Sequence, residues 1–280
     1  MSTTRTLKTA GIAAAAVVAL GLAIPAAASA ATPARAINSQ PAKPTVVLVH
    51  GAWADASSFA PVAKRLQRDG YTVLDAPNPL RGLSTDAASV AAFVNQATTG
   101  PVVLVGHSYG GSVITAAAST LPRVTDLVYV DAFAPATGES IVGLSKGSGS
   151  AFDTDPATVF DAVQDPNMPT GDPDLYVKRD QFRSIFAAHL DAKDAAVLSA
   201  SQSPIAGGAL QETLSGAPAW QTIPSWFVIG TDDKVIPQAG QLAMAHRAHG
   251  QITTVDADHL SMLERPAQIT QVIEKAARTK

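Results

Sequence analysis

The sequence has 280 residues, with 20 basic and 23 acidic side chains, a formal charge of -3 and no cysteine. This length fits one large domain or two small ones, and 46% apolar residues are enough to exclude a wholly disordered chain. Zero cysteine excludes disulfides, thiolate metal sites and a cysteine nucleophile. The mildly acidic balance argues against nonspecific binding to nucleic acid or to anionic membranes, which needs a basic surface.

Residues 1–30 have the pattern of a secretory signal peptide. Arg5 and Lys8 precede an apolar stretch, and Ala28–Ala30 forms a small-x-small cleavage motif. The alternative is a membrane helix, but Pro25 interrupts the stretch. We therefore expect cleavage after residue 30, export to the extracellular space or the periplasm, and no stable membrane anchoring.

Beyond a flexible lead-in expected over residues 31–44, strands alternate with helices through residues 45–280. The β-branched run Thr45–His50 is typical of a strand buried on both faces. Further strands are predicted at Tyr71–Asp75, Pro101–Val105, Leu127–Val130, Ser225–Gly230 and Gln251–Asp256. Helices are predicted at Ser57–Arg68, Ser84–Ala97, Tyr109–Ser119, Gln238–His249 and Arg265–Arg278. This alternation predicts an α/β fold with a mostly parallel central sheet flanked by helices.

The alternation stops over about residues 138–222, where no convincing strand is visible. Asp155-Pro156 and Asp172-Pro173 have the pattern of helix starts, and Leu175–Leu190 is a candidate amphipathic helix. We therefore expect a helical cap inserted over the sheet.

Ser108 stands in the pentapeptide Gly-His-Ser-Tyr-Gly, between the predicted strand Pro101–Val105 and the helix that follows. A strained strand-to-helix turn of this kind lifts a serine hydroxyl above the sheet edge, and glycines on both sides permit the close packing. The alternative is a serine that merely caps the helix. The strand before and the helix after favour a nucleophile.

Serine needs a base to accept its proton. His259 follows the last predicted strand and lies on a loop at the same carboxyl edge as Ser108. His50 and His107 lie inside glycine-containing motifs and are better explained by packing. His246 and His249, on a predicted helix, lack a third metal ligand.

The base in turn needs a carboxylate to hold its tautomer. Asp233, after the predicted strand Ser225–Gly230, gives the chain order Ser, Asp, His that this fold requires. Asp131 is the competitor, because it ends the neighbouring strand and could reach the same histidine.

An oxyanion hole needs two donors. The backbone amide of Tyr109 starts the helix after Ser108, and the loop after the first strand offers the amide of Ala52, with that of Trp53 next. Gly51 permits the close approach, and the Trp53 side chain is expected to line the substrate pocket. No metal or cofactor is needed for this chemistry.

The motifs LVHGAW, GHSYGG, GTDDKVIP and DADHLSMLERP resemble, in this order, the α/β-hydrolase superfamily. The short chain, the single cap and YVDAFAP resemble its small-esterase branch, with plant methylesterases, hydroxynitrile lyases and bacterial secreted esterases. The lyase relatives carry threonine at the position of Gly51 and lysine directly after the base, where this chain has Leu260. The resemblance therefore favours an esterase.

These observations predict a secreted serine hydrolase that cleaves a small-molecule carboxylic ester or lactone. The alternatives are perhydrolase or haloperoxidase activity on the same triad, or a non-catalytic ligand-binding protein on the same scaffold. The cap sequence does not identify the substrate, and nothing in the sequence indicates the oligomeric state. Candidate pocket residues are Tyr176, Phe182, Phe186 and Trp220, although aromatic residues at helical spacing are more often core.

Overall fold

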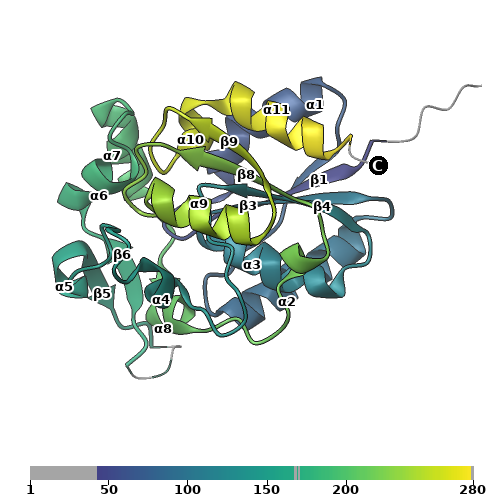
Figure 1. Ribbon diagram of the computed structural model, residues 1–280. Helices are drawn as coiled ribbons and strands as arrows, with labels where there is room; N and C mark the ends of the chain where they lie inside the picture. Colours follow the sequence, from purple (N-terminus) through teal and green to yellow (C-terminus); the bar gives the residue numbers. More distant parts are fainter. Residues whose placement is uncertain (1–42, 167–168, 170, 279–280) are drawn as a thin grey trace, which may run out of the picture. The chain divides into compact units, whose positions relative to one another are not determined.

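The computed structural model describes residues 43–166, 169 and 171–278 and is shown in Figure 1. The expected signal peptide, and the lead-in up to residue 42, lie outside the described residues. Among the helices of the described ranges, none is both long and apolar enough to cross a membrane.

Six strands form one parallel sheet in the order β2-β1-β3-β4-β8-β9. They are β1 (Thr45–Val49), β2 (Val73–Asp75), β3 (Val102–His107), β4 (Val124–Val130), β8 (Ser225–Gly230) and β9 (Gln251–Val255). Every residue of β3 is buried, and so are the last five residues of β4. Burial on both faces explains why these strands appear in the sequence as continuous β-branched runs. The predicted parallel sheet is confirmed.

Helices cover both faces of the sheet. In Figure 1, α1 (Ala60–Arg68) and α11 (Pro266–Ala276) lie above the sheet, and α2 (Leu83–Ala97) and α3 (Tyr109–Ala117) lie below it. The helix α9 (Gln238–Arg247) packs against β8 and β9. Short helical turns are η1 (Ala56–Phe59), η2 (Ala118–Thr120), η3 (Ala219–Gln221) and α10 (Ser261–Glu264). Apolar side chains of sheet and helices form one buried core.

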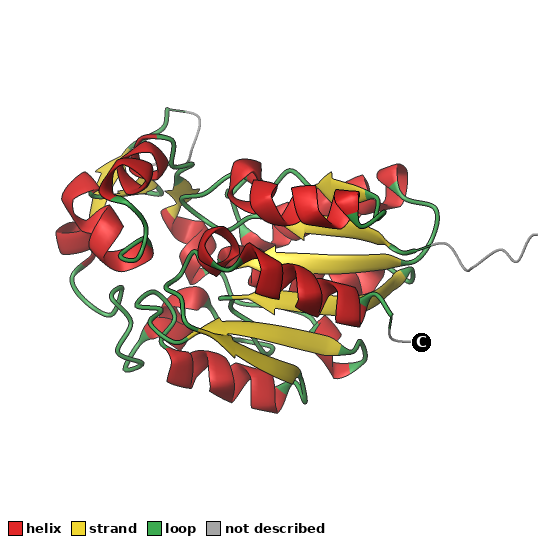
Figure 2. Cartoon of the chain, turned by 90° about the horizontal axis from the view of Figure 1, so that it is seen from above, coloured by secondary structure: helices red, strands yellow, loops and turns green. Residues whose placement is uncertain are grey.

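The segment between β4 and β8 corrects one prediction, because it contains strands as well as helices. A three-stranded antiparallel sheet is formed by β5 (Phe160–Val163), β6 (Asp174–Val177) and β7 (Ile205–Ala206). The helices of this segment are α4 (Ile141–Ser145), α5 (Pro156–Val159), α6 (Arg179–Phe186), α7 (Ala192–Ala200) and α8 (Gly207–Gln211). We call this segment, residues 138–222, the cap. In Figure 2 its small sheet and several of its helices lie beyond one end of the central strands.

The sequence pattern failed here for local reasons. Leu175–Leu190 is not one helix, since β6 takes its first residues and α6 begins only at Arg179. Asp172-Pro173 leads into β6, whereas Asp155 does cap α5 by accepting a hydrogen bond from Ala157 N. Strands of two to four residues are too short to show a two-residue period.

Candidate active site

Ser108 occupies a sharp turn between β3 and α3. Its backbone is left-handed, with φ 52° and ψ -123°, which is unfavourable for a residue with a Cβ. The flanking glycines make this turn possible: a Cβ on Gly106 would lie 2.5 Å from Gly110 O, and one on Gly110 would lie 2.4 Å from Val49 O. The turn therefore has the geometry expected from the pentapeptide.

Three side chains from distant parts of the sequence form one hydrogen-bonded line. Ser108 Oγ lies 2.9 Å from His259 Nε2, and His259 Nδ1 lies 2.8 Å from Asp233 Oδ2. Because a carboxylate only accepts, His259 donates from Nδ1 and its Nε2 is left to accept the serine proton. Ser108 follows β3, Asp233 follows β8 and His259 follows β9, so all three lie at the carboxyl edge of the same parallel sheet, with β4 between β3 and β8.

The carboxylate of Asp233 is held from several sides. Its Oδ1 accepts hydrogen bonds from the amides of Val235 (2.8 Å) and Ile236 (2.9 Å). Its Oδ2 accepts a further bond from Gln241 Nε2 at 2.8 Å. Burial raises the pKa of Asp233, and these donors oppose that rise by stabilising the ionised form. Sequence reasoning missed Gln241, since a polar residue on a helix gave no signal of its own.

Asp131 is fully buried but is directed elsewhere. Its Oδ1 accepts from Gly230 N at 2.7 Å and its Oδ2 from Ser261 N at 3.2 Å. Burial, and next the negative charge of Asp233, raise the pKa of Asp131 well above the ordinary range. Asp131 therefore ties the end of β8 to the loop that carries His259, while Asp233 makes the hydrogen bond to the histidine ring.

His259 is enclosed on all sides. His107 Nε2 lies 2.9 Å from the His259 carbonyl oxygen, and the two rings are 4.8 Å apart between centroids. The ring of Phe186 meets the His259 ring edge to face at 5.2 Å. Burial lowers the pKa of His259 to about 3, against the opposing charge of Asp258. The imidazole is therefore neutral near pH 7 and able to accept a proton.

Two backbone amides beside Ser108 remain available to a ligand. Within the described part of the chain, the amides of Ala52 and Tyr109 donate to no protein acceptor. The amide of Trp53, the other candidate, donates to Ser203 O at 2.9 Å. Gly51 lies so close that a Cβ there would be 2.7 Å from Ser108 Cβ. This leaves Ala52 and Tyr109 as the candidate donor pair.

The Trp53 side chain joins an aromatic cluster that comes mostly from the cap. Its ring stacks on Phe160 at 5.2 Å and meets Phe152 at 5.2 Å and Phe186 at 5.7 Å. Its Nε1 donates to Leu175 O at 2.8 Å. The sequence pattern did not indicate Phe152 and Phe160 as site residues, because they lie in the segment whose strands it did not reveal.

The other aromatic candidates are not gathered at this site. Phe182 stacks on Phe186 at 5.2 Å, one ring further from His259. Trp220 Nε1 donates to Pro135 O at 2.9 Å, and Tyr176 lines a separate hollow beside β5.

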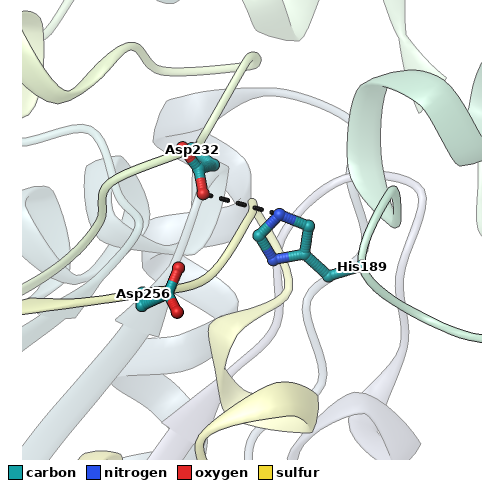
Figure 3. Close-up of side chains that lie close together, drawn as sticks. All are labelled: His189, Asp232 and Asp256. Carbon is teal, nitrogen blue, oxygen red and sulfur yellow. Dashed lines mark ion pairs between the residues drawn. The ribbon is translucent and has the colours of Figure 1, made fainter.

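A polar cluster joins the cap to the loop that carries His259. Figure 3 shows His189 facing Asp232 and Asp256, with His189 Nε2 3.5 Å from Asp232 Oδ2. The other nitrogen, His189 Nδ1, lies 3.0 Å from Glu264 Oε2. Burial, together with a hydrogen bond to Asp258 and its charge, raises the pKa of Glu264 to about 8.

The ligand atoms of this cluster are close enough to hold a cation. Among the described residues there are two groups of three side chains in which each side chain offers one ligand atom and these atoms lie within 4.8 Å of one another. They are His189, Asp232 and Asp256, and His189, Asp258 and Glu264. Both ring nitrogens of His189 already face carboxyl groups, so side-chain contacts within the cluster account for the arrangement without a metal.

The parallel sheet, the strained serine turn and the hydrogen-bonded side chains define an α/β-hydrolase. The family model described as "Alpha/beta hydrolase family" matches residues 46–272, and the chain belongs to this family. The expected resemblance to the α/β-hydrolase superfamily is confirmed.

Three known proteins illustrate the relationship. A carbendazim-hydrolyzing esterase of Nocardioides sp. is 36% identical over 110 residues, which cover 35% of this chain and 46% of that esterase. An alpha/beta hydrolase of Aspergillus novofumigatus, nvfD, is 26% identical over 84% of this chain and 97% of its own length. An extracellular alpha/beta-hydrolase from a Paenibacillus species is similar in structure, with a TM-score of 0.69, 24% identity, and coverage of 84% of this chain and all (100%) of that one.

Proposed function

We propose that this protein is a serine hydrolase that cleaves small-molecule carboxylic esters or lactones through an acyl-enzyme. The single observation that carries the proposal is the continuous line of hydrogen bonds from Ser108 Oγ through His259 to Asp233, at 2.9 and 2.8 Å. The name of the Nocardioides relative, an esterase, supports an ester as substrate.

The reaction takes place in two acyl-transfer steps. Ser108 Oγ attacks the carbonyl carbon while His259 Nε2 takes the hydroxyl proton, and Asp233 stabilises the imidazolium. The amides of Ala52 and Tyr109 stabilise the oxyanion, and loss of one such donor costs about 3 kcal/mol of barrier. His259 then protonates the leaving alcohol, and a water molecule activated by His259 releases the acid and restores Ser108.

Substitution of the nucleophile tests this mechanism. Ser108→Ala should lower kcat for 4-nitrophenyl acetate on the order of 10⁶-fold, because the remaining groups cannot form the acyl-enzyme. Circular dichroism should show an unchanged fold. A folded variant with the wild-type rate would refute the assignment.

Two further measurements separate the alternatives. Mass spectrometry after treatment with a fluorophosphonate should find one adduct, on the peptide that contains Ser108, in the wild type. An unlabelled, inactive wild type would favour a ligand-binding protein. Peracid formation from hydrogen peroxide and acetate, assayed on the same preparation, should be much slower than ester hydrolysis.

We also propose that the protein is exported and loses residues 1–30. Arg5, Lys8 and the Ala28–Ala30 motif support this. N-terminal sequencing of the protein from the culture medium or periplasm should begin at Ala31. A cell-associated chain that still begins at Met1 would contradict export.

A further inference from the structure

The cap contains a cavity of about 470 Å³ that is open to solvent on one side. The residues that line it lie on α4, α8, β5 and β6, at the start of α5, and in the loops before α5 and before β6. Its apolar lining includes Ile141, Phe152, Phe160, Leu175 and Leu210. A cavity of this volume is within the range of small-molecule binding pockets, roughly 300–1,000 Å³.

A series of contacting aromatic rings lies between this cavity and the candidate triad. Phe152 and Phe160 line the cavity, and both also contact Trp53 with ring centroids 5.2 Å away. Phe186 contacts Trp53 at 5.7 Å and His259 at 5.2 Å. The path from His259 to the cavity therefore runs through Phe186 and Trp53 to Phe152 and Phe160.

The triad is closed to solvent in this conformation. Ser108 is 2% exposed and His259 is fully buried. An ester can reach Ser108 only if side chains near the triad move, and the rings of Phe186, Trp53, Phe152 and Phe160 lie in contact from His259 to the cavity. Movement of these rings would therefore open the cap cavity toward Ser108.

The charges near the cavity are turned to other partners or to solvent. The carboxylate of Asp172 accepts from Gly208 N at 2.6 Å, that of the exposed Asp153 accepts from Gly147 N at 2.8 Å, and Lys146 is exposed at the rim. The wall around Leu210 and Phe160 therefore stabilises an apolar group by van der Waals contact and burial. An ionised group placed there would lose its hydration and gain no partner of opposite charge.

We propose that the cap cavity binds the large, uncharged apolar arm of the ester, and that Phe152 and Phe160 form the gate between this subsite and Ser108. This inference rests on the proposed ester hydrolysis, and it makes the substrate an ester with one bulky alkyl or aryl group. Short esters such as ethyl acetate do not fill the subsite.

Filling the cavity tests the proposal. Leu210→Trp places a large ring in the wall of the cavity. Gln211→Trp places a large ring on the same helix, α8, at the exposed rim of the cavity, where a substitution disturbs folding least. Each variant should lower kcat/KM for at least one of two large esters, 4-nitrophenyl octanoate or octyl acetate, by about tenfold or more. Hydrolysis of ethyl acetate, which has no large group on either side of the ester, should stay within about twofold of wild type, since this ester does not reach the subsite. The two large esters distinguish an acyl arm from an alcohol arm.

The matched control is Val197→Trp on α7, where the side chain is 65% exposed and does not line the cavity. It should leave all three esters unchanged. The cap cavity is not the subsite if both cavity variants hydrolyse the large esters as the wild type does. The same conclusion follows if both variants lower kcat/KM for ethyl acetate as much as for the large esters.

A binding measurement separates this inference from the proposed function. Fluorescence titration with N-phenyl-1-naphthylamine should show binding to wild type and to Ser108→Ala, and weaker binding to Leu210→Trp and Gln211→Trp. Absence of ester hydrolysis by the wild type would refute the proposed function, and the titration would still decide the subsite. Normal hydrolysis with equal probe binding by all variants would refute the subsite alone.

Discussion

At the residue scale, two buried aspartates beside the histidine loop have separate tasks. Asp233 accepts the His259 ring hydrogen bond at 2.8 Å, whereas Asp131 accepts the backbone amides of Gly230 and Ser261. Burial, and next the charge of Asp233, raise the pKa of Asp131 well above its ordinary range. One carboxylate can therefore orient the base while the other holds the loop.

Asparagine at each position distinguishes the two tasks. Asp233→Asn should lower kcat for 4-nitrophenyl acetate by about 10⁴-fold, because an amide does not hold the His259 tautomer. Asp131→Asn should keep kcat within about tenfold and mainly reduce thermal stability, because it still offers a carbonyl oxygen to one of the two amides. Steady-state kinetics and differential scanning fluorimetry on both variants give the comparison. The reverse order of kinetic losses would make Asp131 the acid of the triad.

At the scale of elements, Trp53 connects the loop after β1 to the cap by two hydrogen bonds. Trp53 Nε1 donates to Leu175 O in β6 at 2.8 Å, and Trp53 N donates to Ser203 O at 2.9 Å. The loop that carries the candidate oxyanion amide of Ala52 therefore moves with the cap, or is held by it.

Trp53→Phe removes the side-chain bond and keeps an aromatic ring in the cluster. The loss should cost about 1–2 kcal/mol in the free energy of unfolding, and limited proteolysis should cut the cap faster than in wild type. Trp226→Phe is the control, because Trp226 Nε1 bonds to Asp126 within the central sheet, away from the cap. Equal rates of cap cleavage in wild type and Trp53→Phe would show that this bond does not fasten the cap.

The elements also show what the sequence could predict. The central strands and the Ser108 turn follow from burial on both faces and from glycine sterics, which leave clear local patterns. The positions of Asp233 and His259 follow from the parallel topology, which brings the carboxyl ends of strands together. The cap was only partly predictable, because β7 has only two residues and is a strand only through its pairing with β6. Gln241 and the Phe152–Phe160 contacts depend on tertiary packing, which one sequence does not display.

At the scale of the whole molecule, Glu264 links stability to pH. Its folded-state pKa is about 8, raised from 4.5 by burial and by Asp258. A carboxyl group with a raised pKa binds its proton more tightly in the folded state, so its contribution to stability is complete below about pH 4.5 and is lost as pH rises toward 8. His259 acts in the opposite sense, since its pKa falls from 6.5 to about 3 and its contribution is lost as pH falls through that range.

Glu264→Gln removes the titrating group and keeps the side-chain shape. The melting temperature of this variant should decrease less between about pH 5 and pH 8 than that of wild type, because no charge develops beside Asp258. Differential scanning fluorimetry across this range measures the effect. Glu274→Gln, which removes a carboxylate paired with Arg278 on the outer helix α11, should follow the wild-type curve. Parallel curves for Glu264→Gln and wild type would assign the pH dependence to other groups.

The place of the cap in the chain has a consequence for how such a protein can diversify. The cap enters between β4 and β8, after the strand that leads to Ser108 and before the strands that lead to Asp233 and His259. Insertions, deletions or recombination within it leave the spacing of the sheet and of the loops that carry Ser108, Asp233 and His259 unaltered. Selection can therefore remodel the cap while the candidate triad is inherited intact.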